Sequence, residues 1–284
     1  MRALLDPKFS SYLLRVGDGV EESNEKDEIQ IPSKLNIPFT DKIASLNILI
    51  ETIFPNINSY NLDLSLFVKR AILTIRNELV HEINDVLINI FPGEETIYYS
   101  CDENINTCIV HDQEELFHSL TPQGLPPHKL TLKLNAQVIL LRNINPSEGL
   151  CNDTRLLCKG FNTNVIYAEI SVGIHAGKPV FIPRITLETP HDNFTSITFK
   201  RKQFPIRLCF AMTINKAQGQ TLDFVGVYLK EPVFSHGQLY VALSRAKSID
   251  QLKVLIRPPT PLIQHTDYTK NVVYHDVLQA ASSF

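Results

Sequence analysis

The chain has 284 residues, of which 44% are hydrophobic and 20% are charged. This balance is typical of a globular protein, and the length leaves room for two domains with their own cores. The formal net charge is −3, so no overall basic field points to a nucleic-acid partner, and such a contact must come from local groups. The N-terminus is not a signal peptide, and no segment approaches the roughly 18 uncharged apolar residues of a membrane span.

The cysteines argue against two further classes of protein. There are five of them, an odd number, and no pair has Cys-x-x-Cys spacing. This pattern indicates neither a disulfide framework nor a zinc site. We therefore expect reduced thiols in an intracellular compartment and no metal-ligating residues.

The first hundred residues alternate between helical and strand patterns. Apolar residues three or four positions apart indicate helices, whereas a short, nearly all-apolar run indicates a strand buried on both faces of a sheet. In chain order we predict a helix at 8–16, a loop at 21–35, a helix at 41–54, a strand at 68–74, a helix at 77–90 and a strand at 95–100.

The middle of the chain, residues 121–199, has a different texture. Pro, Gly, Asn and Thr separate short runs of partial alternation, which predicts a small antiparallel barrel or sandwich. Helical texture returns after Pro205. There we predict a helix ended by Gly219, a strand at 224–229, a helix from Ser235 to Arg245 and a strand at 252–256. The whole reads as an α/β sheet interrupted by an all-β insertion.

Two strings carry the most chemistry. The polar string, residues 211–221, reads Ala-Met-Thr-Ile-Asn-Lys-Ala-Gln-Gly-Gln-Thr. Its short polar side chains at an expected helix end suit hydrogen bonds to nucleic-acid phosphates; these residues are Thr213, Asn215, Lys216, Gln218 and Gln220. The alternative is a polar helix end beside a turn, which spacing alone favours.

The arginine string, residues 238–245, reads Gln-Leu-Tyr-Val-Ala-Leu-Ser-Arg. The guanidinium of Arg245 offers a fork of donors that fits phosphate oxygens. Against a γ-phosphate it would stabilise the charge that develops in phosphoryl transfer. The alternative is an arginine that interacts with a helix C-terminus and solvent, which composition alone favours.

Other basic residues allow two interpretations. Lys200, Arg201, Lys202 and Arg207 form either a nucleic-acid patch or a solvated loop. In the β module, Arg142 and Arg155 either line a groove for a single strand or flank turn residues.

A phosphate-binding loop is missing from the sequence. The pattern Gly-x-x-x-x-Gly-Lys-[Ser/Thr] does not occur, because the only Gly-Lys pair, Gly177-Lys178, is followed by Pro179. Asp102-Glu103 has no such loop with which to hold magnesium. We therefore expect that the chain alone does not bind ATP.

The strings resemble the C-terminal half of the petite-integration-frequency (PIF-type) DNA helicases of superfamily 1, including those carried by plant Helitron transposons. The matching blocks, in order, are Tyr12-Leu13-Leu14-Arg15-Val16-Gly17-Asp18-Gly19; Ala71-Ile72-Leu73-Thr74 with Glu82-Ile83-Asn84; Leu140-Leu141-Arg142-Asn143 with Gly149-Leu150-Cys151-Asn152-Asp153-Thr154-Arg155; and the polar and arginine strings. Asn271-Val272-Val273-Tyr274 resembles a family tail. The resemblance covers nearly the whole chain.

The resemblance implies a fold and its domains. It implies an α/β protein whose second RecA-like domain, without a P-loop of its own, is built from residues 61–110 and 200–284. A Src-homology-3-like β barrel at 111–199 is inserted into it. Residues 1–60 then correspond to the end of the first RecA-like domain and the connection from it.

The resemblance also implies site residues. The polar string resembles helicase motif V, which contacts DNA, and the arginine string resembles motif VI, whose arginine reaches the γ-phosphate. The block at 73–77 resembles motif IV, which borders the DNA. We therefore expect DNA binding by Thr74, Asn77, Thr213, Asn215, Lys216, Gln218 and Arg142, nucleotide binding by Gly219, Gln220 and Arg245, and catalysis by Arg245.

Three positions depart from the family pattern. Ile75-Arg76 stands where the family often has proline and a small polar residue, which puts a DNA contact there in doubt. Asn215 replaces a frequent histidine. Asn135 replaces a usual glycine within the barrel.

The resemblance predicts the C-terminal part of an ATP-dependent DNA helicase of repair, recombination or replication, nuclear or organellar, that translocates along single-stranded DNA. ATP and magnesium would bind only together with a first RecA-like domain, supplied upstream or by a separate chain. The alternatives are a non-catalytic single-strand-binding module of transposon origin and a protein-interaction barrel. The helicase hypothesis requires that Arg245 lie outside the core and that its flanking strands lie in a parallel sheet.

Overall fold

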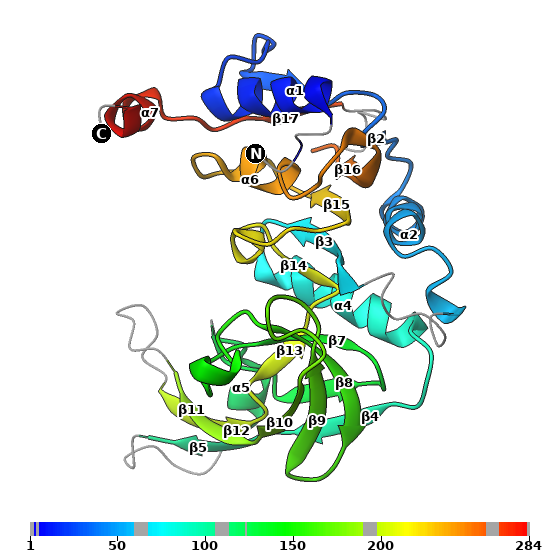
Figure 1. Ribbon diagram of the computed structural model, residues 1–284, viewed down its shortest axis with the longest axis vertical. Coiled ribbons are helices and arrows are strands. Elements are labelled where there is room, and N and C mark those ends of the chain that lie inside the picture. Colours follow the sequence, from blue (N-terminus) through cyan, green and yellow to red (C-terminus); the bar gives the residue numbers. More distant parts are fainter. Residues whose placement is uncertain are drawn as a thin grey trace. The chain divides into compact units, whose positions relative to one another are not determined.

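The computed structural model describes residues 3, 6–59, 68–105, 114–122, 124–189, 198–259 and 267–282. The chain divides into two units, each described by itself (Figure 1). Unit 1 contains residues 1–87 and 210–284, and unit 2 contains residues 88–209.

Unit 1 is built on a sheet of five parallel strands. The strands at its centre are nearly all apolar and buried, as expected for a parallel sheet covered on both faces. In spatial order they are β14 (Ala211–Thr213), β3 (Arg70–Thr74), β15 (Phe224–Leu229), β16 (Leu252–Ile256) and β2 (Asn36–Ile37).

Helix α2 (Lys42–Ile53) packs against this sheet. Its N-terminus is capped by Asp41, whose carboxylate accepts the backbone N–H groups of Ile43 and Ala44, both at 2.9 Å. The helix comes very close to Gly226 of β15, where an added Cβ would lie 2.8 Å from the side chain of Ile53. Only glycine allows this approach, so the sequence sets the distance between helix and sheet.

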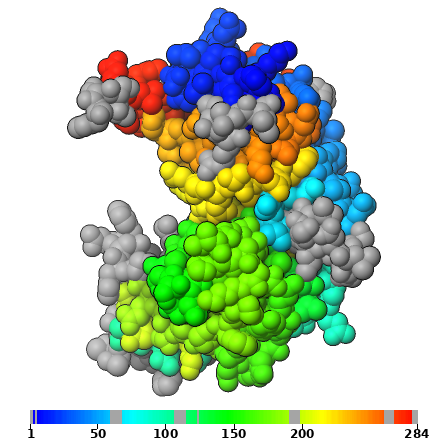
Figure 2. Space-filling model, in the orientation of Figure 1, coloured from blue at the N-terminus to red at the C-terminus, as the bar shows by residue number. Residues whose placement is uncertain are grey.

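Segments from both ends of the chain complete unit 1. Helix α1 (Pro7–Asp18) contacts α6 (Gln238–Leu243), and Figure 2 shows their blue and orange regions lying against each other. The remaining elements are α4 (Asn77–Ile90), which runs into unit 2, β1 (Glu28–Gln30) paired with β17 (Tyr268–Lys270), α7 (His275–Ser282) and the 3-10 turns η1 (Ile57–Ser59), η3 (Asn215–Ala217) and η4 (Ile249–Gln251).

The strand pairs of unit 2 are all antiparallel, as the sequence predicts. A five-stranded sheet has the order β10 (Pro179–Pro183), β9 (Val165–Ile170), β8 (Arg155–Phe161), β7 (Gln137–Leu140) and β13 (Ile206–Leu208). Two smaller sheets are β11 (Ile185–Glu188), β12 (Phe199–Gln203) and β5 (Cys101–Asn104), and β4 (Thr96–Tyr99) with β6 (Lys129–Leu132). The unit also contains α5 (Glu114–Ser119) and η2 (Pro146–Glu148).

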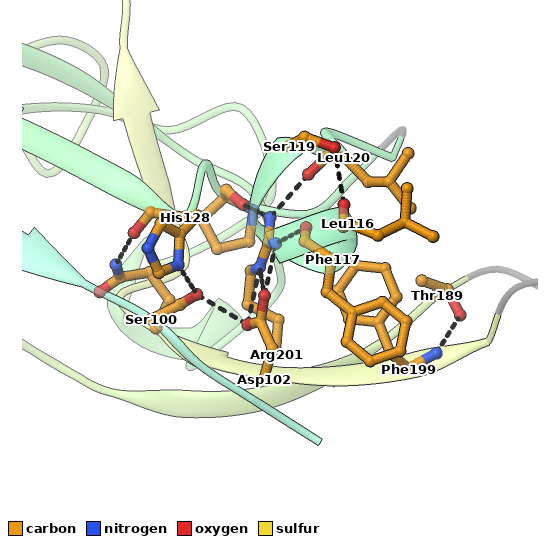
Figure 3. Close-up of polar contacts among 12 residues, drawn as sticks. Ser100, Asp102, Leu116, Phe117, Ser119, Leu120, His128, Thr189, Phe199 and Arg201 are labelled. Atoms are coloured by element: carbon orange, nitrogen blue, oxygen red, sulfur yellow. Dashed lines mark hydrogen bonds and ion pairs between the residues drawn. The ribbon is translucent and has the colours of Figure 1, made fainter. Parts of the chain in front are cut away.

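A buried ion pair organises one side of unit 2 (Figure 3). The guanidinium of Arg201 on β12 faces the carboxylate of Asp102 on β5 at 2.6 Å, and both side chains are fully buried. Arg201 also donates to the backbone carbonyls of Phe117, Leu120 and Pro126. One charged pair therefore joins two strands to α5 and the loop after it.

The predicted helix between Pro205 and Gly219 is wrong. This segment instead forms two short strands, β13 and β14, and the turn η3. Ala211 and Met212 are buried because β14 pairs with β3. A short apolar run suits a buried strand as well as a buried helix, so the spacing of Thr213 and Lys216 does not place them on one helix face.

Smaller differences concern the ends of elements. The predicted loop at 21–35 contains β1. Helix α6 begins at Gln238 rather than near Ser235, and it is preceded by Gly237 in a left-handed conformation, with φ of 67°.

The units differ from the predicted domains. The inserted domain was expected at residues 111–199, and its first boundary, 110/111, lies outside the described residues. The observed boundaries between the units lie at 87/88 and 209/210. Residues 88–105 and 200–209 belong to unit 2 because β4, β5, β12 and β13 pair only with strands of that unit. Residues 6–59 are part of unit 1, since β2 is a strand of its parallel sheet and α2 covers that sheet.

Candidate nucleic-acid interface

The polar string begins where two neighbouring parallel strands end. Thr213, the last residue of β14, lies opposite Thr74, the last residue of β3. The backbone N–H of Ile214 donates to the carbonyl of Thr74 at 2.9 Å. In open α/β sheets, ligands bind beyond the carboxyl ends of the strands. The polar string and the segment after β3 therefore share a binding edge.

The turn after β14 exposes polar groups at this edge. Asn215, Gln218 and Gly219 are exposed, whereas Lys216 and Gln220 are half-buried. The turn is closed by backbone hydrogen bonds from the N–H of residue 218 to the carbonyl of 215 and from that of 220 to that of 217. The exposed amides of this turn offer both donors and acceptors, so they suit contacts to a phosphate backbone.

The segment after β3 contributes less than expected. Thr74 is fully buried, and its hydroxyl oxygen has no hydrogen-bond partner among the described residues. The side chain of this last strand residue faces the core, and its contact with DNA stays a prediction. Asn77, the first residue of α4, is exposed and remains a candidate.

Arg76 is a group at this edge that sequence reasoning did not assign to the site. Its side chain is 57% exposed, and its Nη2 lies 2.7 Å from Glu231, which follows β15. The sequence contained one signal for Arg76. The departure from the family pattern at residues 75–76 places a cation directly after a predicted strand.

Arg245 lies inside unit 1, with an exposed fraction of 5%. Its Nε donates to the carbonyl of Val241, its Nη1 to the carbonyls of Ala217 and Gln220, and its Nη2 to the hydroxyl of Ser244. The expectation of an arginine outside the core is therefore wrong, and the first requirement of the helicase hypothesis is not met in this conformation. The physical reason is that two carbonyls of the polar string take up the guanidinium.

The second requirement on Arg245 is met. The strands that flank it in sequence, β15 and β16, pair with each other in the parallel sheet. The Arg245 carbonyl accepts the N–H of Leu222 at 3.2 Å, so main chain and side chain both join the arginine string to the polar string. The two strings that the sequence singles out are thus one structural assembly.

The basic residues of unit 2 are mostly used internally. Arg201 and Arg207 are buried, and Lys200 pairs with Glu188 at 3.0 Å. Both interpretations of these residues, a basic patch and a solvated loop, are wrong, because they lie on strands: Arg201 faces the interior from β12, and Arg207 is buried on β13. Arg155, at 3% exposed, donates to Gln137, so it lines no open groove.

Arg142 remains half-buried in unit 2. Its Nη1 donates weakly, at 3.3 Å, to the carbonyl of the preceding residue, and its guanidinium lies beside Gly124. Its role in DNA binding stays a prediction.

One group of side chains in unit 2 lies close enough to hold a metal. The ligand atoms of Asp102, His118 and His128 lie within 4.8 Å of one another. Asp102 already accepts hydrogen bonds from Arg201 and Ser100, and the two imidazoles stack with centroids 3.6 Å apart. A metal would lie beside a guanidinium, so we assign none to this group.

Burial and electrostatics act in opposite directions on Asp102. Burial raises its pKa, but hydrogen bonds from Arg201 and Ser100 lower it more, so the pKa lies below its usual value. Burial lowers the pKa of His128, and the neighbouring His118 lowers it further.

Comparison with known proteins finds similarity to PIF-type DNA helicases. The model for the "DNA helicase Pif1, 2B domain" matches residues 115–161. The ATP-dependent DNA helicase PIF1 of Rattus norvegicus is 38% identical over 156 residues, which are 53% of this chain and 23% of the rat protein. The human PIF1 is 34% identical over 179 residues, 61% of this chain and 25% of that protein. This chain is homologous to the C-terminal region of PIF-type DNA helicases.

Solved PIF-type structures share the fold. Pif1 helicase from Candida albicans aligns over 100% of this chain and 58% of its own, with a TM-score of 0.62 and 21% identity. Bacteroides Pif1 bound to ssDNA aligns over 100% of this chain and 55% of its own, with a TM-score of 0.60 and 20% identity. At about 20% sequence identity, these structural matches show that the α/β fold is shared and no more.

The present chain spans about a quarter of the length of the curated PIF-type relatives. The activity of the whole relatives therefore does not follow for this chain from the similarity alone. Among the described residues, no helix has the length and apolar character needed to span a bilayer.

Proposed function

We propose that this chain supplies the DNA-gripping and phosphate-responsive part of an ATP-dependent DNA helicase. The observation that carries the proposal is the polar string, which leaves the sheet edge at Thr213 and exposes Asn215 and Gln218 beyond the carboxyl ends of β14 and β3. Homology to PIF-type helicases supports the same role. The partner of this edge is single-stranded DNA.

The nucleotide side of the proposal involves Gly219, Gln220 and Arg245. They lie at the far end of the polar string, where Arg245 binds the carbonyls of residues 217 and 220. ATP and magnesium would be held by a P-loop domain that is not part of this sequence. Arg245 would then reach the γ-phosphate only after leaving those carbonyls, and this exchange would couple nucleotide binding to the DNA-facing turn.

Unit 2 has a place in the same proposal. Its antiparallel sheets support the expectation of a Src-homology-3-like barrel inserted into a RecA-like domain. The cellular setting would be DNA repair, recombination or replication in the nucleus or an organelle.

Binding of a fluorescent oligothymidylate, followed by anisotropy, tests the DNA contact. We expect the Lys216→Ala variant to bind several-fold more weakly than the wild type, because it lacks a cation at the edge. Lys247→Ala, which removes an exposed lysine and its surface pair with Asp223, is the control and should bind like the wild type. Equal affinity for all three proteins would contradict the proposed interface.

Hydrolysis by the purified chain tests the second part. We expect no DNA-stimulated ATP hydrolysis by this polypeptide alone, since the sequence contains no Gly-x-x-x-x-Gly-Lys-[Ser/Thr] loop. Stimulated hydrolysis would overturn that expectation. If no P-loop domain restores hydrolysis in a mixture, the non-catalytic, transposon-derived binding module is the better description.

A further inference from the structure

The parallel sheet of unit 1 has a cation shortly after each of its strands. Neighbouring strands lie about 4.8 Å apart, so these residues follow the sheet edge at short intervals. In spatial order they are Lys216 after β14, Arg76 after β3, Lys230 after β15, Arg257 after β16 and Lys42 after β2. The basic character of the edge therefore continues beyond the polar string.

A cavity of about 710 Å³ lies at the far part of this edge, beyond β15, β16 and β2. Its volume falls in the range of roughly 300–1,000 Å³ that is usual for small-ligand sites. Lys230, Arg257, Phe39 and Tyr268 are among its lining residues. The position matches the general location of ligands in open α/β sheets.

The cavity lining contains three cations, Lys42, Lys230 and Arg257, and three carboxylates, Glu28, Asp41 and Glu231. Glu231 pairs with Arg76, Lys42 pairs with Glu82, and Asp41 caps helix α2. The carboxylate of Glu28, also in the lining, accepts a hydrogen bond from Asn24. Within the part of the chain that the structure describes, Lys230 and Arg257 form no ion pair, and Arg257 lies beside the phenol of Tyr228. These two side chains are suited to an anionic group.

Aromatic and proline residues form much of the remaining wall, beside polar residues such as Thr40 and Thr269. Phe39 is half-buried, and Tyr268 is 39% exposed. Pro232, Pro258 and Pro259 complete the apolar lining. Aromatic faces beside cations are the combination with which proteins hold single-stranded nucleic acid, because every base offers a face for stacking.

We propose that this cavity binds one nucleotide unit, with its phosphate on Lys230 and Arg257 and its base against Phe39 and Tyr268. If the nucleotide belongs to a DNA strand that continues from the polar string, the inference rests on the proposed function. A free mononucleotide offers the same chemistry, so the experiment separates the two sources.

The test uses the full chain and two probes, thymidine 5′-monophosphate and oligothymidylates of increasing length. The variant is Lys230→Gln with Arg257→Gln, two half-buried cations, and the control, Lys8→Gln with Lys247→Gln, removes two exposed cations outside the cavity. Circular dichroism melting verifies that each variant is folded. A third protein, Tyr268→Leu, keeps the charges and removes one stacking face.

We expect the Lys230/Arg257 variant to bind at least one probe about tenfold more weakly than the wild type, with a smaller loss for Tyr268→Leu. A loss confined to longer oligonucleotides assigns the cavity to the DNA strand, and a loss for the monophosphate assigns it to a free nucleotide. Wild-type affinity of the variant for both probes would overturn the proposal. If oligonucleotide binding depends on Lys216 but not on this pair, the further inference alone fails. If no oligonucleotide binds, the proposed function fails, and the monophosphate still tests the cavity.

Discussion

At the residue scale, Arg245 shows how one side chain ties two segments together. Its guanidinium donates to two carbonyls of the polar string while its own helix provides the other acceptors. A carbonyl deprived of such a donor inside a protein loses a hydrogen bond to a charged group, worth about 1.5–3 kcal/mol. The conformation of the turn after β14 therefore depends on this arginine.

The first prediction concerns Arg245→Ala. We expect faster amide hydrogen exchange at residues 215–222 and an affinity for oligothymidylate below that of the wild type, because the turn loses two of its ties. Arg245→Lys should restore little, since an ammonium does not reproduce the guanidinium fork. Lys247→Ala is the control. Unchanged exchange at 215–222 in Arg245→Ala would show that the turn does not need this side chain.

The second prediction concerns the buried pair in unit 2. Asp102→Ala leaves the charge of Arg201 buried without its carboxylate, and we expect a loss of about 3–5 kcal/mol in the free energy of unfolding in urea. Glu188→Ala breaks the neighbouring exposed pair with Lys200 and should cost about 0–1 kcal/mol. Similar losses for both variants would contradict the assigned burial.

The third prediction follows from the low pKa of Asp102. A carboxyl group whose pKa is lower in the folded state stabilises the fold above its unfolded pKa, and this contribution is lost as the pH falls through the folded value. We expect the stability difference between wild type and Asp102→Asn to be constant above about pH 5 and to shrink below about pH 4. A difference that grows in acid would contradict the sign of the shift.

The sequence identifies Arg245 as important but does not show where its side chain lies. An arginine at the end of a helix has the same local pattern whether it faces solvent, a phosphate or a carbonyl. The acceptors at residues 217 and 220 come from a segment about 25 positions away in the chain, so only the fold brings them together. The burial of Thr74 also depends on the fold and does not show in the local sequence pattern.

At the scale of elements, glycine sets the packing of α2 on the sheet. A Cβ at Gly226 would lie 2.8 Å from Ile53 and 3.0 Å from Leu49. Both residues are buried on the inner face of α2. A larger residue at this position would therefore force the side chains of α2 to shift.

The fourth prediction is that Gly226→Ala lowers the free energy of unfolding by about 1–3 kcal/mol, because the core must shift to admit a methyl group. Gly160→Ala in β8 is the matched control: its Cβ would meet Tyr167 at 3.6 Å, an ordinary contact. Thermal melting of both variants measures the effect. Equal midpoints would contradict the tight approach of α2.

Element prediction from the sequence succeeds where periodicity is long. Helices α1, α2 and α4 and strands β3, β15 and β16 begin and end close to their predicted positions. The prediction for segment 206–219 fails because its apolar run of five residues, 208–212, has no decisive period, and the end of this run pairs with β3 as a strand. The polar residues were found, but on a turn rather than on a helix.

At the scale of the whole molecule, the sequence predicts an α/β sheet interrupted by an all-β module, and the structure has both. The unit boundaries follow strand pairing between distant segments, such as β5 with β12, which local patterns do not reveal. The same holds for β2, whose two residues extend the parallel sheet from a segment read as a connection. Strand pairing between distant segments thus determines the unit boundaries, which composition does not show.

The most direct test of the central claim is the salt dependence of binding to oligothymidylate. If the sheet edge grips the phosphate backbone, the logarithm of the affinity falls linearly with the logarithm of the salt concentration, with a slope of about −0.7 for each phosphate contact on a single strand. Lys216→Ala should make the slope less steep by about 0.7, and Lys247→Ala should leave it unchanged. An affinity independent of salt, or no binding at low salt, would contradict the claim that this chain holds DNA.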